Sequence, residues 1–333
     1  MNRKQYTAIA FALVGAAALS AQAVVAKDLT VAVYSAFTTL DPYDASDTLS
    51  QNVAKSFYEG LFGFDKDMKL VNVLAESYDV SKDGLEYTIK LKQGIKFSDG
   101  EPFNAAAVKA NFDRVTNPEN HLTRYQLYRN IESEVVDDAT VKFHLKEAFS
   151  AFINQLAHPS GVMICPKTLA LSKKEVAFNP CGTGPYVLEK YNPAEYLVVK
   201  KNPNYWQKGL PKLDSISFRP VLEDATRVAM LRTGEAQFVD VVPPEHVERL
   251  KETPNIVVDA APSIVQRQIY LNNTKKPFND LRVRQALNYG LDKHAMVKVL
   301  YKGFSAPATG VAPEGIDFAK QFGEWPYDPK KAK

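Results

Sequence analysis

Apolar and polar side chains alternate along several stretches of the chain, which is the pattern of a β-strand with one buried face. The clearest case is 85–91, where Leu85, Tyr87, Ile89 and Leu91 alternate with charged or hydroxyl-bearing residues. On similar grounds, further strands are expected at 29–33, 141–145, 186–190, 196–200, 216–221, 234–240, 256–259 and 265–271.

Apolar residues at helical spacing occupy the segments between these strands. Asn104 can cap a helix that carries Phe112 on its apolar face, and Ser46 or Asp47 can cap an earlier helix whose apolar face extends to Leu61. Other helices are expected at 149–156, 224–232 and 244–251, with two more after the candidate caps Asn279 and Asp292. Strands and helices interspersed in this way predict an α/β fold of the mixed α+β kind.

The segment 179–186 interrupts this regular pattern with two glycines and two prolines. Gly182 and Gly184 allow a sharp turn or a close approach to another group, and Pro185 restricts φ just before the strand that starts at Tyr186. An ordinary structural turn has the same composition. With a strand following directly, the segment is interpreted as a crossover between two folded units.

Residues 1–26 have the pattern of a secretory signal peptide. Arg3 and Lys4 precede an apolar run over 8–19, and small residues at 24–26 suit cleavage after Ala26. The apolar run is too short to span a bilayer. The mature chain is therefore expected to be soluble and periplasmic.

Charge and composition narrow the possible partners. The formal net charge is +3, and without Arg3 and Lys4 it is 3 − 2 = +1. A charge so close to neutral argues against nucleic acid as a partner. A length of 333 residues suggests about two domains.

The only cysteines are Cys165 and Cys181. In an exported protein, such a pair predicts a disulfide, and closing a loop of this size would stabilise the fold by about 3 kcal/mol. The alternative is two thiols that lie too far apart to bond. Suitably spaced histidines are missing, so the pair does not predict a zinc site.

Catalytic and metal-binding patterns are not evident. The five histidines have neither HExxH nor HxH spacing, and P-loop, GxGxxG and GxSxG motifs are missing. His158 differs from the other four because it precedes Pro159 and Ser160 in a loop after an apolar helix, and binding groups are common in such loops. A structural role for His158 stays open. The sequence predicts a binding protein, not an enzyme, with no cofactor and no metal.

Nine motifs along the chain belong together. They are TLDP at 39–42, YEGL at 58–61, LAESY at 74–78, IKFSDG at 95–100, NAAAVK at 104–109, GTGPY at 182–186, NPNYW at 202–206, VRQAL at 283–287 and YDP at 327–329. In these motifs and their order, the chain resembles the family-5 periplasmic solute-binding proteins of ABC importers. The stretches SAFIN at 150–154, LPKLDSI at 210–216 and PATGV at 307–311 resemble the glutathione-binding branch of that family.

This resemblance implies a two-lobed periplasmic-binding-protein clamp, type II-like, with an extra domain II. Domain I would comprise 27–57 and 183–269, domain II 58–182, and domain III would begin at 270. Because the family continues beyond its YDP motif, the resemblance implies that domain III is truncated in these 333 residues. Family residues that fix a peptide's ends would then lie outside them.

The resemblance also implies a ligand and its contacts. Glutathione or a small peptide would bind between the lobes, and a monomer would deliver it to an ABC permease. The residues expected to face the ligand are Asp47, Thr48, His158, Pro159, Ser160 and Tyr270. Alternatives are a dipeptide or oligopeptide binder, a nickel-complex binder, a secreted hydrolase and a chain that binds nothing.

Overall fold

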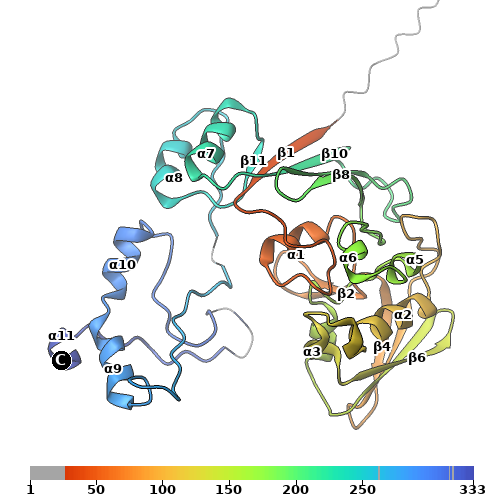
Figure 1. Cartoon of the computed structure of the whole chain (residues 1–333), viewed down its shortest axis with the longest axis horizontal. Coiled ribbons are helices and arrows are strands. Elements are labelled where there is room, and N and C mark those ends of the chain that lie inside the picture. The colour runs from red at the N-terminus through yellow and green to blue at the C-terminus, as the bar shows by residue number, and fades with distance from the viewer. Residues whose placement is uncertain (1–26, 262, 315, 317–318) are drawn as a thin grey trace, which may run out of the picture.

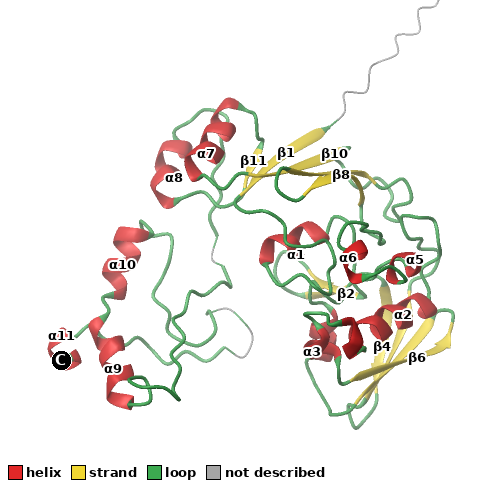
Figure 2. Cartoon of the chain, viewed as in Figure 1, coloured by secondary structure: helices red, strands yellow, loops and turns green. Residues whose placement is uncertain are grey.

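The computed structural model describes residues 27–261, 263–314, 316 and 319–333. The signal peptide expected at 1–26 lies outside the described residues. Two larger sheets, with helices beside them, make up most of the part before residue 252 (Figures 1 and 2). The chain therefore has the mixed α/β character predicted from its pattern.

The first sheet has five strands in the order β11-β1-β10-β9-β8. Their bounds are β1 (Asp28–Val33), β8 (Tyr186–Asn192), β9 (Tyr196–Lys201), β10 (Ser215–Pro220) and β11 (Phe238–Val239). Strand β1 runs parallel to β10 and β11, whereas the β8–β9 and β9–β10 pairs are antiparallel. All five strands fall within the two segments expected for domain I.

The second sheet is antiparallel, with four strands in the order β4-β5-β7-β6. Their bounds are β4 (Ala75–Val80), β5 (Glu86–Leu91), β6 (Ile131–Asp137) and β7 (Thr140–Leu145). The predicted alternation is confirmed in β5 and β7, where every second side chain is buried. Helix α2 (Ala105–Thr116), capped by Asn104 as predicted, packs on that buried face, and Phe112 meets Phe143 with ring centroids 4.7 Å apart.

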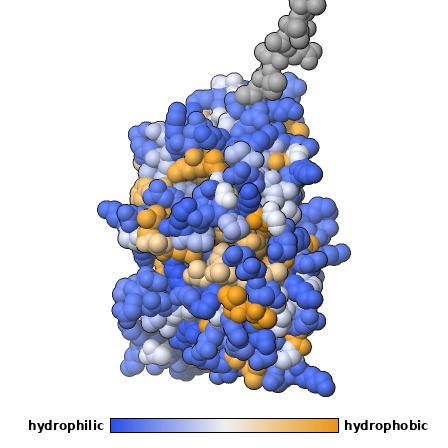
Figure 3. All heavy atoms as spheres, turned by 90° about the vertical axis from the view of Figure 1, so that its right-hand side faces the viewer, coloured by the Kyte–Doolittle hydropathy of each residue, from blue (hydrophilic) through white to orange (hydrophobic). Residues whose placement is uncertain are grey.

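One hydrophobic cluster runs through both sheets. It includes Val33 of β1, Ile89 of β5 and Tyr186 of β8, together with Phe57 between them. The surface on the side of the four-stranded sheet is mostly hydrophilic, with hydrophobic side chains in scattered patches (Figure 3). The two sheets therefore share a core even though they form separate layers.

The crossover at 179–186 joins the two sheets. The amide of Gly184 donates to the Phe57 carbonyl at 2.9 Å, and the amide of Tyr186 donates to the Ser56 carbonyl at 2.9 Å. A Cβ added to Gly184 would lie 2.5 Å from the Phe57 carbonyl carbon. Glycine is therefore required here by close backbone approach, not by a left-handed turn.

Most helices begin where the sequence predicts, but some end earlier than predicted. Helix α1 (Thr48–Ala54) is capped by Asp47, but it ends before Phe57 and Leu61, which are buried in the segment that follows. Helices α7 (Asp224–Thr233) and α8 (Pro244–Lys251) lie as predicted, and Gly234 ends α7 with a φ of 76°. Helix α4 (Phe152–Leu156) is shorter than the predicted 149–156.

The remaining elements are short or lie late in the chain. They are β2 (Phe62–Phe64), β3 (Leu70–Asn72), η1 (Pro118–Asn120), α3 (Tyr125–Tyr128), α5 (Pro166–Leu169), α6 (Lys173–Val176), α9 (Leu281–Gly290), α10 (Lys293–Leu300) and α11 (Pro329–Ala332). Asp292 caps α10 as expected, but Asp280, not Asn279, caps α9. The strands predicted at 256–259 and 265–271 are wrong: the described residues there form no strand, because no neighbouring strand pairs with them.

The part after Leu250 lacks a core of its own. Among the described residues from 251 to 333, none is buried. Helices α9 and α10 lie away from α2 and β6 in Figure 1 and leave apolar side chains such as Leu281, Val299 and Leu300 more than half exposed. Isolated helices of this length are marginal in water, because helical stability comes mainly from tertiary packing.

Limited proteolysis should therefore cut this chain first between 252 and 333. Local opening there exposes little new apolar surface, whereas opening the four-stranded sheet disrupts the shared core. Mass spectrometry of early fragments checks this, with cuts in the exposed 81–84 turn as the internal comparison. Equal protection of both regions would contradict the expectation.

Candidate functional site

The start of α1 is a capped helix end. The amide of Ser50 donates to Oδ1 of Asp47 at 2.8 Å, and the Thr38 hydroxyl donates to Oδ2. Partial burial tends to raise the pKa of Asp47, but the hydrogen bonds from Thr38 and Ser50 outweigh it and lower that pKa. Asp47 is thus a carboxylate at the helix start. The amides of Thr48 and Leu49 donate no hydrogen bond within the described part.

The loop after α4 holds His158 in a fixed orientation. The Ser160 amide donates to His158 Nδ1 at 3.1 Å, and the Ser160 hydroxyl lies 2.8 Å from the same nitrogen and 3.0 Å from the Tyr128 hydroxyl. Burial, and then the charge of Arg124, lower the pKa of His158. Ser160 is fully buried, so it orients the imidazole, while His158 and Pro159 keep partial exposure.

Arg124 connects these two places. Its Nε and Nη2 donate to the Ala45 carbonyl at 3.0 and 2.7 Å, just before α1, and its charge acts on His158. Arg124 therefore binds directly to the segment before α1, and its charge also reaches the His158 loop. Arg124 is not predictable from the sequence, because it belongs to none of the nine motifs and its partner Ala45 lies far away along the chain.

Aromatic side chains form a wall beside Asp47. Tyr191 lies close enough for the Asp47 charge to act on it, and burial, followed by that charge, raises the pKa of Tyr191 to about 12. Its ring lies 6.5 Å from Phe37 and 5.5 Å from Phe178, measured between centroids. Tyr270, the last predicted contact, is 88% exposed, and no hydrogen bond joins it to the other predicted site residues in the described part.

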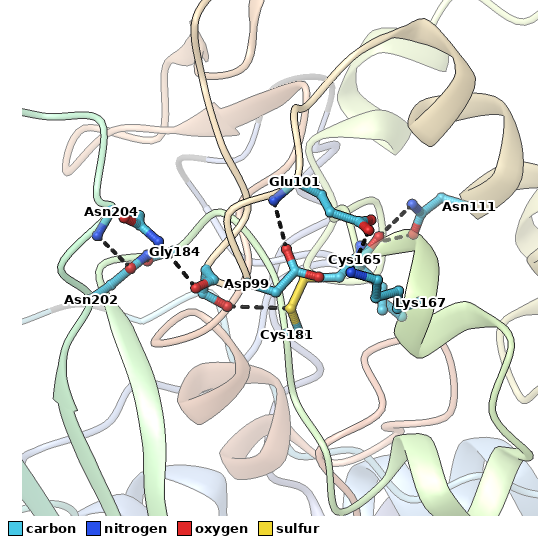
Figure 4. Close-up of a disulfide and its surroundings, with 11 residues drawn as sticks. Asp99, Glu101, Asn111, Cys165, Lys167, Cys181, Gly184, Asn202 and Asn204 are labelled. Atoms are coloured by element: carbon cyan, nitrogen blue, oxygen red, sulfur yellow. Dashed lines mark hydrogen bonds and ion pairs between the residues drawn. A yellow bond between two sulfur atoms is a disulfide. The ribbon is translucent and has the colours of Figure 1, made fainter.

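Cys165 and Cys181 form a disulfide, with Cα atoms 5.4 Å apart (Figure 4). The Cys165 amide donates to the Cys181 carbonyl at 2.9 Å, and the Ser98 hydroxyl lies 3.3 Å from the Cys181 sulfur. Asp99 is also near both sulfurs. Because the sulfurs are bonded to each other, neither can act as a thiolate ligand, so the cluster braces the crossover and does not suit a metal.

Glu59 joins the segment after α1 to the segment after β9. Its carboxylate accepts hydrogen bonds from the Thr183 hydroxyl at 3.0 Å, the Tyr205 hydroxyl at 2.9 Å and the Trp206 indole at 2.7 Å. The YEGL, GTGPY and NPNYW motifs therefore meet at one carboxylate. Their sequences singled out these residues, but only the structure shows why they belong together.

The stability of the protein should depend on pH through Glu59. Desolvation raises the pKa of Glu59 in the folded state, in spite of the hydrogen bonds from Trp206, Tyr205 and Thr183, which lower it. The folded protein then holds this proton to higher pH than the unfolded chain does. The contribution is present below the unfolded value of 4.5 and is lost as pH rises through the folded pKa.

Urea unfolding of the wild type and of Glu59→Gln at pH 4.5 and pH 7 tests this dependence. We expect the free energy of unfolding to fall less between the two pH values in Glu59→Gln, because the titrating group is gone. Glu132→Gln, on exposed β6, serves as the matched control and should follow the wild type. If the free energy of unfolding changed by the same amount between the two pH values in all three proteins, Glu59 would not cause the pH dependence.

A surface pocket lies away from the residues predicted to face the ligand. It has a volume of about 470 Å³ and is lined by Glu76, Lys92, Gln93, Ile95 and Trp206. None of the predicted ligand contacts lines it. In the part of the chain that the structure describes, no helix has the length and apolar character needed to cross a membrane.

Comparison with known proteins identifies the family. The profile of the family described as "Bacterial extracellular solute-binding proteins, family 5 Middle" matches residues 69–333. The chain is 59% identical over 312 residues to the glutathione-binding protein GsiB of Salmonella typhi, covering 93% of this chain and 61% of that protein. For GsiB of Escherichia coli (strain K12) the values are 57% over 321 residues, 96% and 63%.

Solved structures of periplasmic binding proteins have a fold similar to that of this chain. The periplasmic binding protein DppA from Helicobacter pylori, associated with an ABC transporter and in complex with the peptide STSA, matches with a TM-score of 0.83 at 28% identity, over 92% of this chain and 64% of that one. NikA from Brucella suis in complex with Fe(III)-EDTA matches with a TM-score of 0.79 at 27% identity, over 92% and 62%. The predicted periplasmic-binding-protein fold is thereby confirmed.

The alignments cover only part of each relative. The chain spans about three fifths of the length of the curated relatives it matches. The family profile matches residues 69–333, which is most of this chain, and the relative from Salmonella typhi is 59% identical over 93% of it. The chain therefore belongs to the family-5 bacterial extracellular solute-binding proteins.

Proposed function

We propose that this chain is the periplasmic solute-binding component of an ABC importer, that it captures glutathione and that it acts without catalysis. The observation that carries the proposal is the 59% identity to a glutathione-binding protein over 93% of the chain. Export through a signal peptide at 1–26, a monomeric state and delivery to a membrane permease belong to the same proposal.

The chemistry around Arg124 supports an anionic peptide ligand. Glutathione carries two carboxylates and an ammonium group, and charge-assisted hydrogen bonds to carboxylates are among the stronger polar contacts in proteins. Arg124 and His158 supply donors, Asp47 supplies an acceptor for an ammonium, and the aromatic wall of Phe37 and Tyr191 supplies apolar surface. We propose that Thr48, Pro159 and Tyr270 also face the ligand.

We further propose the clamp implied by the family. Domain I would comprise 27–57 and 183–269, domain II 58–182, and domain III would begin at 270. Ligand would bind between lobes joined by hinge strands, and closure of the lobes would trap it. The Glu59 cluster and the disulfide lie beside the segments 56–58 and 182–186, whose backbones are joined by hydrogen bonds, and would hold these two connections together.

Isothermal titration calorimetry with reduced glutathione tests the proposal. We expect saturable binding and, for Arg124→Ala, an affinity weaker by roughly tenfold, or about 1.4 kcal/mol. Lys190→Ala, which removes a cation from exposed β8, is the matched control and should bind like the wild type. If the calorimeter detected binding of a dipeptide but not of glutathione, the glutathione proposal would be wrong and a peptide ligand would replace it. DppA, solved in complex with the peptide STSA, is an example of such a binder.

A further inference from the structure

A groove lies between α7 and α8, on the five-stranded side of the molecule. It has a volume of about 190 Å³ and is lined by Ala225, Val228, Ala229, Arg232, His246, Arg249 and Leu250. Val228 and Leu250 are buried and make an apolar floor, and the two alanines leave room above it. This volume is below the range of about 300–1,000 Å³ that small-molecule sites occupy, so the groove suits one or two inserted side chains.

The charge in the groove is positive and unbalanced. Arg232 and Arg249 form no ion pair within the described residues, and neither their side chains nor that of His246 make a hydrogen bond there. Neighbouring cations are paired instead: Arg219 with Glu235 at 2.7 Å and Lys251 with Glu248 at 3.0 Å. A helix C-terminus favours cations in its last turn, but that effect does not require both arginines to line the same groove.

The two segments that lead into α7 and α8 are exposed, and one of them has an unusual backbone conformation. Leu222 and Val241, just before α7 and α8, are 73% and 55% exposed. Val241 has a φ of 59°, which is a true outlier for a β-branched residue. Buried Arg227 donates to both of their carbonyls, at 3.2 and 3.3 Å, and holds the two residues together. Such strained backbone is concentrated at functional sites.

We propose that this groove is the docking site for an acidic segment of a partner protein. Two guanidinium groups match the planar geometry of carboxylates, and arginine is enriched at protein interfaces. The identification of that partner as the membrane permease rests on the proposed function.

The test uses fluorescence anisotropy with a labelled, capped tetraglutamate peptide as the probe and its tetraglutamine counterpart as the reference. We expect only the acidic peptide to bind, with an affinity that falls as salt rises. The variant Arg232→Gln/Arg249→Gln should weaken binding at least tenfold. The control Arg219→Gln/Lys251→Gln removes the same charge outside the groove and should bind the acidic peptide like the wild type.

Three results would overturn the proposal: no binding of the acidic peptide, equal loss in both double variants, or complete displacement by an equal concentration of inorganic phosphate, which would indicate a simple anion site. Calorimetry with glutathione separates this test from that of the proposed function. Glutathione affinity should be unchanged in Arg232→Gln/Arg249→Gln, because the groove is distinct from the site around Arg124.

Discussion

Replacing Arg114 by alanine is expected to lower the free energy of unfolding by about 3–5 kcal/mol, because it leaves a buried carboxylate without its partner. Arg114 of α2 donates through Nη1 and Nη2 to the two oxygens of Asp41 at 3.2 and 2.5 Å. Their side chains are only 8% and 0% exposed. The Tyr43 amide also donates to Asp41, at 3.0 Å, so the pair anchors the TLDP segment onto the helix.

Urea denaturation measures this effect, and the same helix provides the control. Lys109 pairs with Asp113 at 2.6 Å, but their side chains are 41% and 56% exposed. Exposed pairs contribute at most about 1 kcal/mol, so Lys109→Ala should change stability little. If Arg114→Ala were no more destabilising than Lys109→Ala, the buried pair would not be the anchor described here.

Removing the disulfide is expected to lower stability by about 3 kcal/mol, since closing a loop of this size restricts the unfolded chain by that much. At roughly 2–4 °C per kcal/mol, the melting temperature should fall by about 6–12 °C. The variant Cys165→Ala/Cys181→Ser suits the site, because Cys165 is buried and Cys181 is partly exposed. Ligand identity should change less than stability, because neither cysteine is among the groups gathered around Arg124.

Scanning calorimetry of the wild type with and without a reductant is the companion measurement. It opens the same bond without changing a side chain, so it separates the cross-link from the packing of Cys165. A melting temperature unaffected by reduction would show that the bridge contributes nothing. A drop seen only in the double variant would assign the loss to packing.

Local patterns of the chain predicted the parts that depend on neighbours in sequence. Alternation along β5 and β7 matches their buried faces, because successive side chains on a strand point to opposite sides. Asn104 and Asp47 cap α2 and α1 because a short polar side chain can accept a hydrogen bond from its own first turn. These interactions need no partner from elsewhere in the molecule.

The failures occur where a distant partner decides. The segment 265–271, predicted as a strand, forms none, because strand structure requires a neighbouring strand to accept its hydrogen bonds. Phe57 and Leu61 have helical spacing but lie beyond the end of α1, where the segment pairs with the crossover instead of continuing the helix.

By itself, the sequence determined the family, the mixed α/β class, most strand faces and most helix starts, since these follow from recurring motifs and from contacts within a few residues. Only the tertiary structure decided that Asp41 meets Arg114, that Glu59 binds Tyr205 and Trp206, and that Arg124 binds the Ala45 carbonyl before α1. Those pairings join residues far apart along the chain. Their energies depend on burial and on donor–acceptor distances of about 3 Å, and neither can be inferred from a local sequence pattern.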